Sequence, residues 1–192
     1  MKKVLLILAH PDIDSLSDQL GDKYKEGAEA SGADVKVLTI RDLHFDPVLY
    51  HGYRKPEIIE RDIIKSRELI SWADHLVFIF PNWWGTYPAL FKGFIDKVFW
   101  PEFAFRYRKG STKWDKLLKG KTARVIITMD TPFWYYYFIQ GSPGHKAFKN
   151  ATLKFCGINP VRIKVLTPVR IASAKKIESW LLKIYQLGKK IR

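Results

Sequence analysis

The sequence contains very little cysteine and no long apolar run. Cys156 is the only cysteine among 192 residues, which excludes a disulfide framework within the chain and favours a reducing compartment, so we expect a cytoplasmic protein. No apolar run approaches the roughly 20 residues that a membrane-spanning helix needs. The apolar start of the chain reaches His10 and Pro11 without a small-residue cleavage site. We therefore expect no stable membrane insertion, and we interpret the first apolar segment as a strand.

Several signatures of catalytic and nucleotide-binding sites are also missing. The chain has no GxGxxG, no GxxxxGK and no G-x-S-x-G motif, so neither a Rossmann dinucleotide site, a P-loop nor a hydrolase elbow is supported. No group of His, Cys and carboxylate residues has zinc-site spacing, and we expect no metal site. The side chains alone are poorly equipped for difficult chemistry, which favours a bound organic cofactor.

Negative charge is scarce relative to positive charge. The chain has 33 Lys and Arg against 19 Asp and Glu, a formal net charge of +14, which would favour an anionic cofactor or a nucleic acid. The basic residues are scattered along the chain, however, and the densest group, between residues 175 and 192, belongs to a predicted amphipathic helix. We expect no nucleic-acid partner.

The most regular pattern lies between residues 75 and 99. The run from His75 to Phe80 is continuously hydrophobic, as in a strand covered on both faces, and Pro81 ends it. After Pro88, apolar residues return with the spacing of a helix that buries one side. The residues with this spacing are Ala89, Leu90, Phe91, Phe94, Ile95, Val98 and Phe99. The loop 81–87 is thus predicted at the carboxyl end of a central strand, where open α/β sheets bind ligands.

The rest of the chain alternates strand and helix patterns and predicts one α/β domain over residues 1–192. Besides the central strand, strands are expected at 3–9, 34–40, 122–128 and 160–167. Helices are expected at 16–31, 58–72, 88–99, 147–155 and 173–187. The segments 41–57 and 100–121 are aromatic without a clean period, and we expect them to be irregular.

The loop after the first strand has the features of an anion site. Ser15 and Ser17 lie near the predicted start of a helix, where hydroxyl and backbone N–H groups can donate to a phosphate. Asp12 and Asp14 would repel a phosphate unless they point outward. The pattern indicates a phosphate site without a glycine-rich fingerprint.

Two stretches carry a resemblance to a known family. PNWWGTYPALFKGFIDKVF follows the central strand, and F-x-Y at residues 105–107 precedes a K-L-L-K-G-K-T-A run. Both resemble the NAD(P)H:quinone oxidoreductases of the flavodoxin-like superfamily, a group that includes modulator of drug activity B-like proteins. The resemblance implies a three-layer α/β sandwich with a five-stranded parallel sheet of order 2-1-3-4-5 and helices on both faces. It also implies a bound flavin, FMN or alternatively FAD, reduced by NAD(P)H.

The resemblance also implies which residues contact the flavin. Around the phosphate it places His10, Ser15, Leu16 and Ser17; along the ring, Pro81, Asn82, Trp83, Trp84 and Gly85; and at the ring's pyrimidine edge, Met129, Asp130 and Thr131. This chain departs from the family after the fourth strand. Family members usually have Thr-Gly-Gly there, whereas this chain has Asp130, Thr131 and Pro132. Proline has no N–H to donate to the ring.

A second departure concerns the catalytic residues. The family pattern Y-x-x-Q-G-x-H-G corresponds here to a stretch beginning at Tyr137, in which Pro143 replaces the histidine. The resemblance implies that Tyr137 meets the negative charge that develops on the reduced ring. His145, two residues beyond Pro143, is the candidate to replace the missing histidine.

The implied activity is a two-electron reduction of quinones or similar planar acceptors by ping-pong hydride transfer. Two alternatives remain open: a flavodoxin-type electron carrier, which the basic charge disfavours, and an ancillary regulatory subunit of a potassium-efflux transporter. The aromatic segments 44–53 and 100–107 exceed what one small sheet can bury, so we also expect a homodimer with the sites at the subunit boundary.

Overall fold

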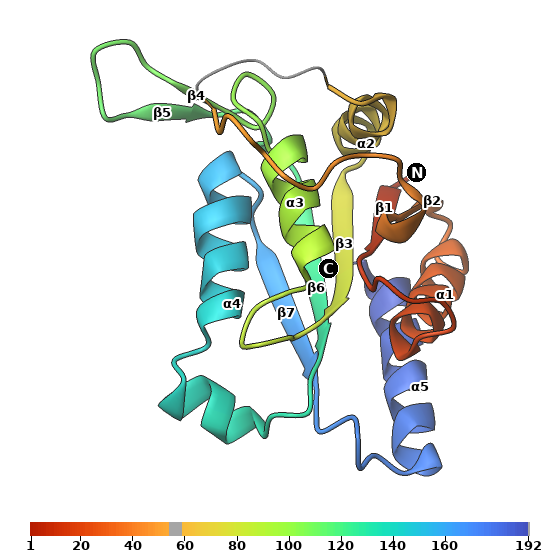
Figure 1. Ribbon diagram of the computed structural model, residues 1–192. Helices are drawn as coiled ribbons and strands as arrows, with labels where there is room; N and C mark the ends of the chain where they lie inside the picture. The colour runs from red at the N-terminus through yellow and green to blue at the C-terminus, as the bar shows by residue number, and fades with distance from the viewer. Residues whose placement is uncertain (54–58, 192) are drawn as a thin grey trace.

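The computed structural model describes residues 1–53 and 59–191, and a parallel five-stranded sheet forms its centre (Figure 1). Its strands lie in the order β2-β1-β3-β6-β7, which is 2-1-3-4-5 when only these five are counted, as predicted. Their bounds are β1 (Lys3–Leu8), β2 (Asp34–Thr39), β3 (His75–Pro81), β6 (Thr122–Thr128) and β7 (Val161–Leu166).

Helices cover both faces of the sheet because successive strand residues point to opposite sides. In β1, Val4 and Leu6 face α1 (Leu16–Glu29) and α5 (Ala174–Lys190), whereas Leu5 and Ile7 face the other layer. That second layer contains α2 (Arg61–Trp72), α3 (Ala89–Val98), and the consecutive helical segments α4 (Pro143–Lys146) and η3 (Ala147–Lys154). The three-layer prediction is confirmed.

Two glycines let α1 and α5 approach each other closely. A Cβ atom on Gly27 would lie 2.1 Å from the carbonyl oxygen of Tyr185, and one on Gly188 would lie 2.3 Å from that of Tyr24. Neither backbone oxygen can yield, so only glycine allows this approach. The contact fixes α1 against the sheet independently of the loop that precedes it.

The segment 100–121 is not irregular, contrary to our expectation. It contains a small antiparallel sheet of β4 (Phe105–Tyr107) and β5 (Trp114–Lys116), at the upper left of Figure 1. Trp114 anchors it, since its Nε1 donates to the carbonyl of Phe155 at 2.9 Å and the two rings stack at 4.6 Å. Strands of three residues are too short to show a period in sequence.

Other boundaries shift by a few residues. A 3₁₀ turn, η1 (Ile40–Asp42), follows β2, and α2 begins at Arg61, while part of the predicted helix start at 58 lies outside the described residues. The stretch after β6, for which no helix was predicted before residue 147, contains the π-helical turn η2 (Tyr135–Ile139). Within the described residues, no helix combines the length and apolar character needed to cross a membrane.

Candidate functional site

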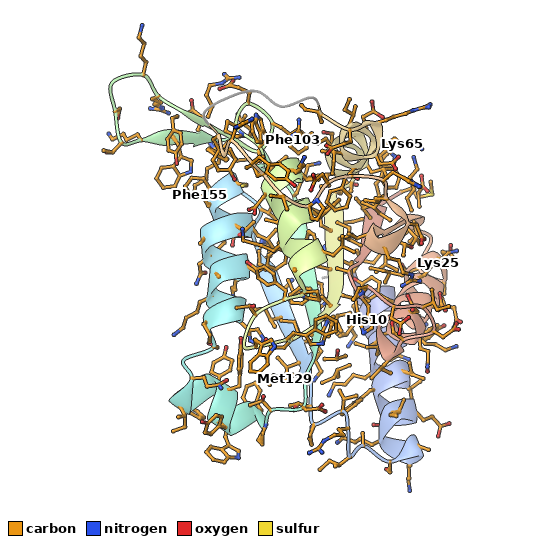
Figure 2. The ribbon with its side chains drawn as sticks, in the orientation of Figure 1. His10, Lys25, Lys65, Phe103, Met129 and Phe155 are labelled. Carbon is orange, nitrogen blue, oxygen red and sulfur yellow. The ribbon has the colours of Figure 1, made fainter. Side chains whose placement is uncertain are left out.

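The carboxyl ends of β1, β3, β6 and β7 meet around a cavity of about 200 Å³. This end of the sheet is the lower one in Figure 2, where the labels of His10 and Met129 mark it. The lining residues are His10, Leu16, Ser17, Pro81, Asn82, Trp83, Thr128, Met129, Asp130 and Val169. The loops after β1, β3, β6 and β7 therefore converge on one cavity.

The two serines of the first loop have different roles. Ser15 is the N-cap of α1: its hydroxyl donates to Asp18 Oδ2 at 2.9 Å and accepts from the Asp18 backbone N–H at 3.3 Å. Ser17 is 1% exposed, and its hydroxyl has no hydrogen-bond partner among the described residues. A buried polar group without a partner is costly unless a ligand satisfies it. Ser17, which lines the cavity, is the hydroxyl that remains available to an anion.

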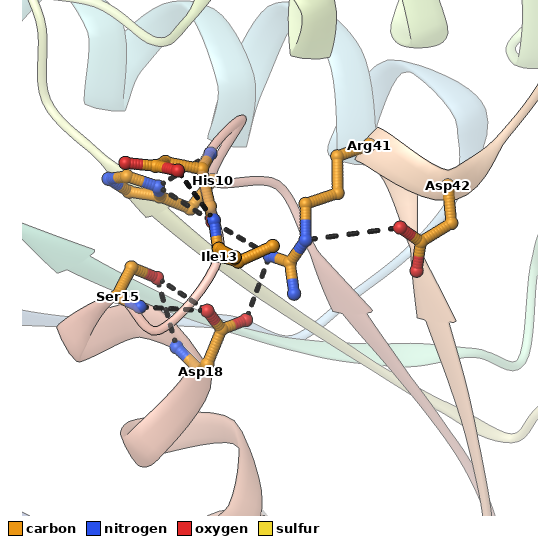
Figure 3. A network of polar contacts seen from close by, with 7 residues as sticks. His10, Ile13, Ser15, Asp18, Arg41 and Asp42 are labelled. Atoms are coloured by element: carbon orange, nitrogen blue, oxygen red, sulfur yellow. Dashed lines mark hydrogen bonds and ion pairs between the residues drawn. The ribbon is translucent and has the colours of Figure 1, made fainter.

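The charges of this loop are arranged around Arg41, which our sequence reasoning did not single out. Arg41 Nη1 donates to the carbonyl of Asp12 and to Asp18 Oδ1, both at 2.9 Å (Figure 3). Asp12 and Asp14 are exposed and do not line the cavity. Of the first-turn N–H groups of α1, that of Asp18 donates to Ser15, so those of Leu16 and Ser17 are left to bind an anion here.

The loop after β3 gives one tryptophan to the cavity and turns the other away. Trp83 lines the cavity, and its ring meets His10 edge-on at 5.9 Å. Trp84 is fully exposed and has a positive φ of 52°, and Gly85 follows with φ 77°. Asn82 Oδ1 is buried without a hydrogen-bond partner in the described part of the chain. It is a ready acceptor for an N–H of a planar ring.

The loop after β6 is tied to the connection between β7 and α5. Asp130 Oδ1 accepts from the backbone N–H of Arg170 at 2.6 Å, and the Thr131 carbonyl accepts from the Thr167 hydroxyl at 2.6 Å. These bonds bring Val169 into the cavity wall. Sequence reasoning missed this fourth loop, because nothing in its composition distinguishes it from an ordinary connection.

Tyr137 and His145 lie near each other but do not line the cavity. Their ring centroids are 6.4 Å apart, and Tyr137 is half exposed and stacks on Phe133 at 4.8 Å. His145 is 4% exposed, and neither ring nitrogen has a hydrogen-bond partner among the described residues. Burial lowers the pKa of His145 to about 4, so the ring is neutral at pH 7.

Hydrogen bonds connect this region to the loop 82–86 after β3. The carbonyl of Gly85 accepts from the Tyr136 hydroxyl at 2.9 Å and from the Gly144 N–H at 3.0 Å. These two bonds tie the loop 82–86 to η2 and to α4.

The cavity thus collects eight of the predicted site residues and leaves six outside. Those in its wall are His10, Leu16, Ser17, Pro81, Asn82, Trp83, Met129 and Asp130. Those outside it are Ser15, Trp84, Gly85, Thr131, Tyr137 and His145. Across residues 1–53 and 59–191, no three His, Cys, Asp or Glu side chains gather closely enough to hold a metal ion.

Comparison with known proteins places the chain in a family. The model of the flavodoxin-like fold family matches residues 2–187. The chain belongs to this family. It is 34% identical to Smu.1420 of Streptococcus mutans, whose crystal structure superposes on it with a TM-score of 0.86. The match covers 98% of this chain and all of the Streptococcus chain.

Two further proteins have informative names. An uncharacterized NAD(P)H oxidoreductase of Haemophilus influenzae is 26% identical over 177 residues, which are 89% of this chain and 86% of that protein. An FMN-dependent NADH-azoreductase of Bacillus anthracis, solved in complex with FMN, has the same fold, with 18% identity, 99% of both chains covered and a TM-score of 0.76. The resemblance found in the sequence is confirmed at the level of the family.

Proposed function

We propose that the protein is a flavin-dependent NAD(P)H oxidoreductase that transfers two electrons to a quinone or a similar planar acceptor. The observation that carries this proposal is the pair of unpartnered buried groups in the cavity, the Ser17 hydroxyl and Asn82 Oδ1. One is placed at a helix start, where a phosphate fits, and the other beside Trp83, where a planar ring fits. The name of the Haemophilus relative supports the same activity.

The flavin is proposed to be FMN. The N-terminus of one helix suits one phosphate group. The loop carries the exposed carboxylates of Asp12 and Asp14, and Asp42 in the turn η1 adds a third beside Arg41. A second phosphate, as in FAD, would add negative charge to an acidic rim, whose Arg41 already contacts Asp18. The FMN complex of the Bacillus neighbour supports the same choice.

The chain would hold the cofactor from two sides. Ser17 and the first-turn N–H groups of α1 would hold the phosphate, and Pro81, Asn82 and Trp83 would lie along the ring. Bound FMN would accept hydride from NAD(P)H and pass two electrons to the acceptor. The protein would supply position, flat walls and hydrogen bonds.

Tyr137 and His145 remain our proposed donors toward the developing negative charge. The neutral imidazole of His145 has an N–H to donate and does not need to be protonated. In the single chain both residues lie outside the cavity wall. The proposal therefore requires the part of the flavin ring that meets the acceptor to extend past Trp83 toward Tyr137 and His145. Replacement of Tyr137 by Phe should slow reduction by NAD(P)H in stopped-flow measurements while leaving flavin bound. Reduction at the parent rate would remove Tyr137 from the mechanism.

We also propose that the protein is a cytoplasmic homodimer. The expected contact segments are partly covered by their own chain: Phe45 packs on Phe94, and Tyr53 on Trp100. The larger exposed aromatic surface instead lies at residues 133–139, beside the site. Sedimentation of the flavin-bound protein at micromolar concentration should give a dimer, and a monomer would contradict the proposal.

The decisive experiment for the activity uses the purified protein. We expect a flavin absorption spectrum, release of a compound with the mass of FMN on heating, and NAD(P)H oxidation that depends on an added quinone. Absence of flavin binding, even after incubation with FMN, would contradict the proposed function. Release of FAD would contradict only the choice of cofactor.

A further inference from the structure

The loop from His10 to Ser17 is held by side chains that do not line the cavity. Arg41, in the turn η1 after β2, reaches across to this loop and donates from one nitrogen to two oxygens, the Asp12 carbonyl and Asp18 Oδ1, each at 2.9 Å. The side chains of Arg41 and Asp18 are both only 18% exposed. The ion pair is therefore less screened by water than an ordinary surface pair.

Asp18 uses its second oxygen for the same loop. Asp18 Oδ2 accepts from the Ser15 backbone N–H at 3.0 Å and from the Ser15 hydroxyl at 2.9 Å (Figure 3). Burial opposes the charge of this carboxylate, but the hydrogen bonds from Ser15 and Arg41 outweigh it and lower the pKa of Asp18. One charged carboxylate thus joins the loop, the start of α1 and the turn η1.

The residue that this arrangement fixes most directly is Ser17. It lies between Ser15 and Asp18 in the first turn of α1, buried and without a hydrogen-bond partner among the described residues. Because the loop is bound at Asp12 on one side and at Ser15 and Asp18 on the other, the Ser17 hydroxyl and the adjacent N–H groups have little freedom before a ligand arrives. Such preorganisation raises affinity by reducing the ordering cost of binding.

We propose that Arg41 and Asp18 are positioning residues that set the affinity of the loop His10–Ser17 for the phosphate of the flavin without touching it. The inference rests on the proposed function, since it requires a flavin phosphate at Ser17. It predicts that the pair matters for ligands with a phosphate and not for the same ring without one.

A purely structural role for the pair makes a different prediction. α1 is held against α5 through Gly27 and Gly188, and it buries Leu20 and Tyr24 in the core. These contacts do not involve Arg41, so the helix should stay in place when the ion pair is removed. If the pair instead supported the whole site, its loss would weaken every flavin equally.

The test compares FMN with riboflavin, which has the same ring and lacks the phosphate. Apoprotein carrying Arg41→Met, Asp18→Asn or both is titrated by flavin fluorescence. Each single variant should lose about tenfold in FMN affinity, the scale of one charge-assisted contact. The double variant should lose no more than the single variant that binds FMN less tightly. Riboflavin affinity should stay at the parent value.

A matched control comes from the same helix. Lys23 and Glu26 form an exposed ion pair at 2.8 Å on α1, away from the cavity. Lys23→Met with Glu26→Gln removes the same charges, so it should leave both affinities unchanged. An equal loss of FMN affinity in this control would overturn the inference, because general charge would then explain the effect.

Three further outcomes separate the inference from the proposed function. An equal fall in FMN and riboflavin affinity would show a structural role, and unchanged FMN affinity would show no role; either result overturns the inference. Should Arg41→Met not fold, Arg41→Lys keeps the charge but loses the fixed fork of donors, and FMN affinity at the parent value would again overturn it. A parent protein that binds no FMN contradicts the proposed function itself.

Discussion

The two ends of the cavity, the proposed phosphate end at Ser17 and the proposed ring end at Trp83, are built in opposite ways. At the phosphate end, Arg41, Asp18 and Ser15 form a continuous set of hydrogen bonds that exists in the protein alone. Beside the ring end, outside the cavity wall, Trp84 and the segment 133–139 leave aromatic side chains in solvent. The largest exposed groups there are Trp84, Trp134, Phe138 and Ile139. The hydrogen-bonded frame of the first end is present before binding, with the Ser17 hydroxyl left for a ligand, whereas the aromatic side chains beside the second end are exposed.

This difference separates affinity from specificity. The phosphate is the part common to every turnover, and a rigid polar loop suits it. Nicotinamide and acceptor must bind and leave in turn, and flat exposed rings suit planar molecules that alternate on one surface. The same exposed rings would also suit a second subunit.

The strongest way to break the contrast is to disturb the ring end at Gly144. A Cβ atom there would lie 2.6 Å from the Gly85 carbonyl oxygen and 2.7 Å from Thr86 Cα, both backbone atoms. Gly144→Ala should lower the free energy of unfolding by about 4 kcal/mol through collision and the loss of a hydrogen bond. Chemical denaturation measures this. Gly21→Ala is the control: its Cβ meets the flexible end of Leu8 at 2.6 Å, and it should cost less than about 1 kcal/mol.

Acid should affect the ring end before the phosphate end. Burial lowers the pKa of His145 to about 4, while the unfolded chain titrates near 6.5. Between pH 6.5 and 4 the unfolded state therefore binds more protons, and stability falls as pH decreases, by on the order of 3 kcal/mol for this residue. Burial also lowers the pKa of His75, to about 3, which adds to the loss in the same window.

Unfolding curves recorded from pH 7 to pH 4 test this assignment. His145→Phe should reduce the slope of stability against pH by about one proton. Asp18→Asn should leave the slope in that window unchanged, because the pKa of Asp18 is lowered and its contribution is lost only below its usual value of 3.8. An unchanged slope in His145→Phe would mean that this histidine is not buried neutral.

The two serines give a smaller and sharper test. Ser17→Ala should weaken FMN binding by about 2 kcal/mol, as expected for a hydrogen bond to a charged acceptor, while the stability of the free protein stays equal or rises. Ser15→Ala should instead cost about 1 kcal/mol of stability, because it removes the N-cap. Titration of apoprotein and thermal unfolding measure both quantities. Equal effects of the two substitutions on FMN affinity would contradict the assignment of the phosphate to Ser17.

These assignments show where sequence reasoning succeeded and where it stopped. Buried runs such as His75–Phe80 carry their burial in the residue types, so the strands were predictable. Their order followed from the family resemblance and is confirmed. The choice between Ser15 and Ser17 depends on which hydroxyl closes the capping box. Arg41 lies 23 residues from Asp18, and no local pattern relates two such positions.

The ring end was harder to predict for a related reason. Adjacent tryptophans look alike in sequence, but in the structure Trp83 lines the cavity, whereas Trp84, with a φ of 52°, is fully exposed. Val169 enters the wall through bonds between two loops that follow different strands. Such contacts depend on tertiary geometry rather than on periodicity.

The smallest expected effect is also the most informative about the exposed end. Trp84 is fully exposed and has a φ of 52°, a conformation that costs a non-glycine residue on the order of 1 kcal/mol. Within the described residues, side-chain packing does not offset this cost, because the indole is fully exposed and lines no wall of the cavity. Trp84→Gly should therefore change the free energy of unfolding by less than about 1 kcal/mol, since relief of strain opposes the added freedom of the unfolded chain.

If the indole of Trp84 contacts a planar acceptor, the same variant should raise KM for a quinone while flavin stays bound. If it acts on a second subunit, sedimentation should instead show dissociation at micromolar concentration. A fall in melting temperature of several degrees without either change would mean that Trp84 stabilises the folded chain itself. The contrast between a hydrogen-bonded phosphate end and an exposed ring end would then be wrong.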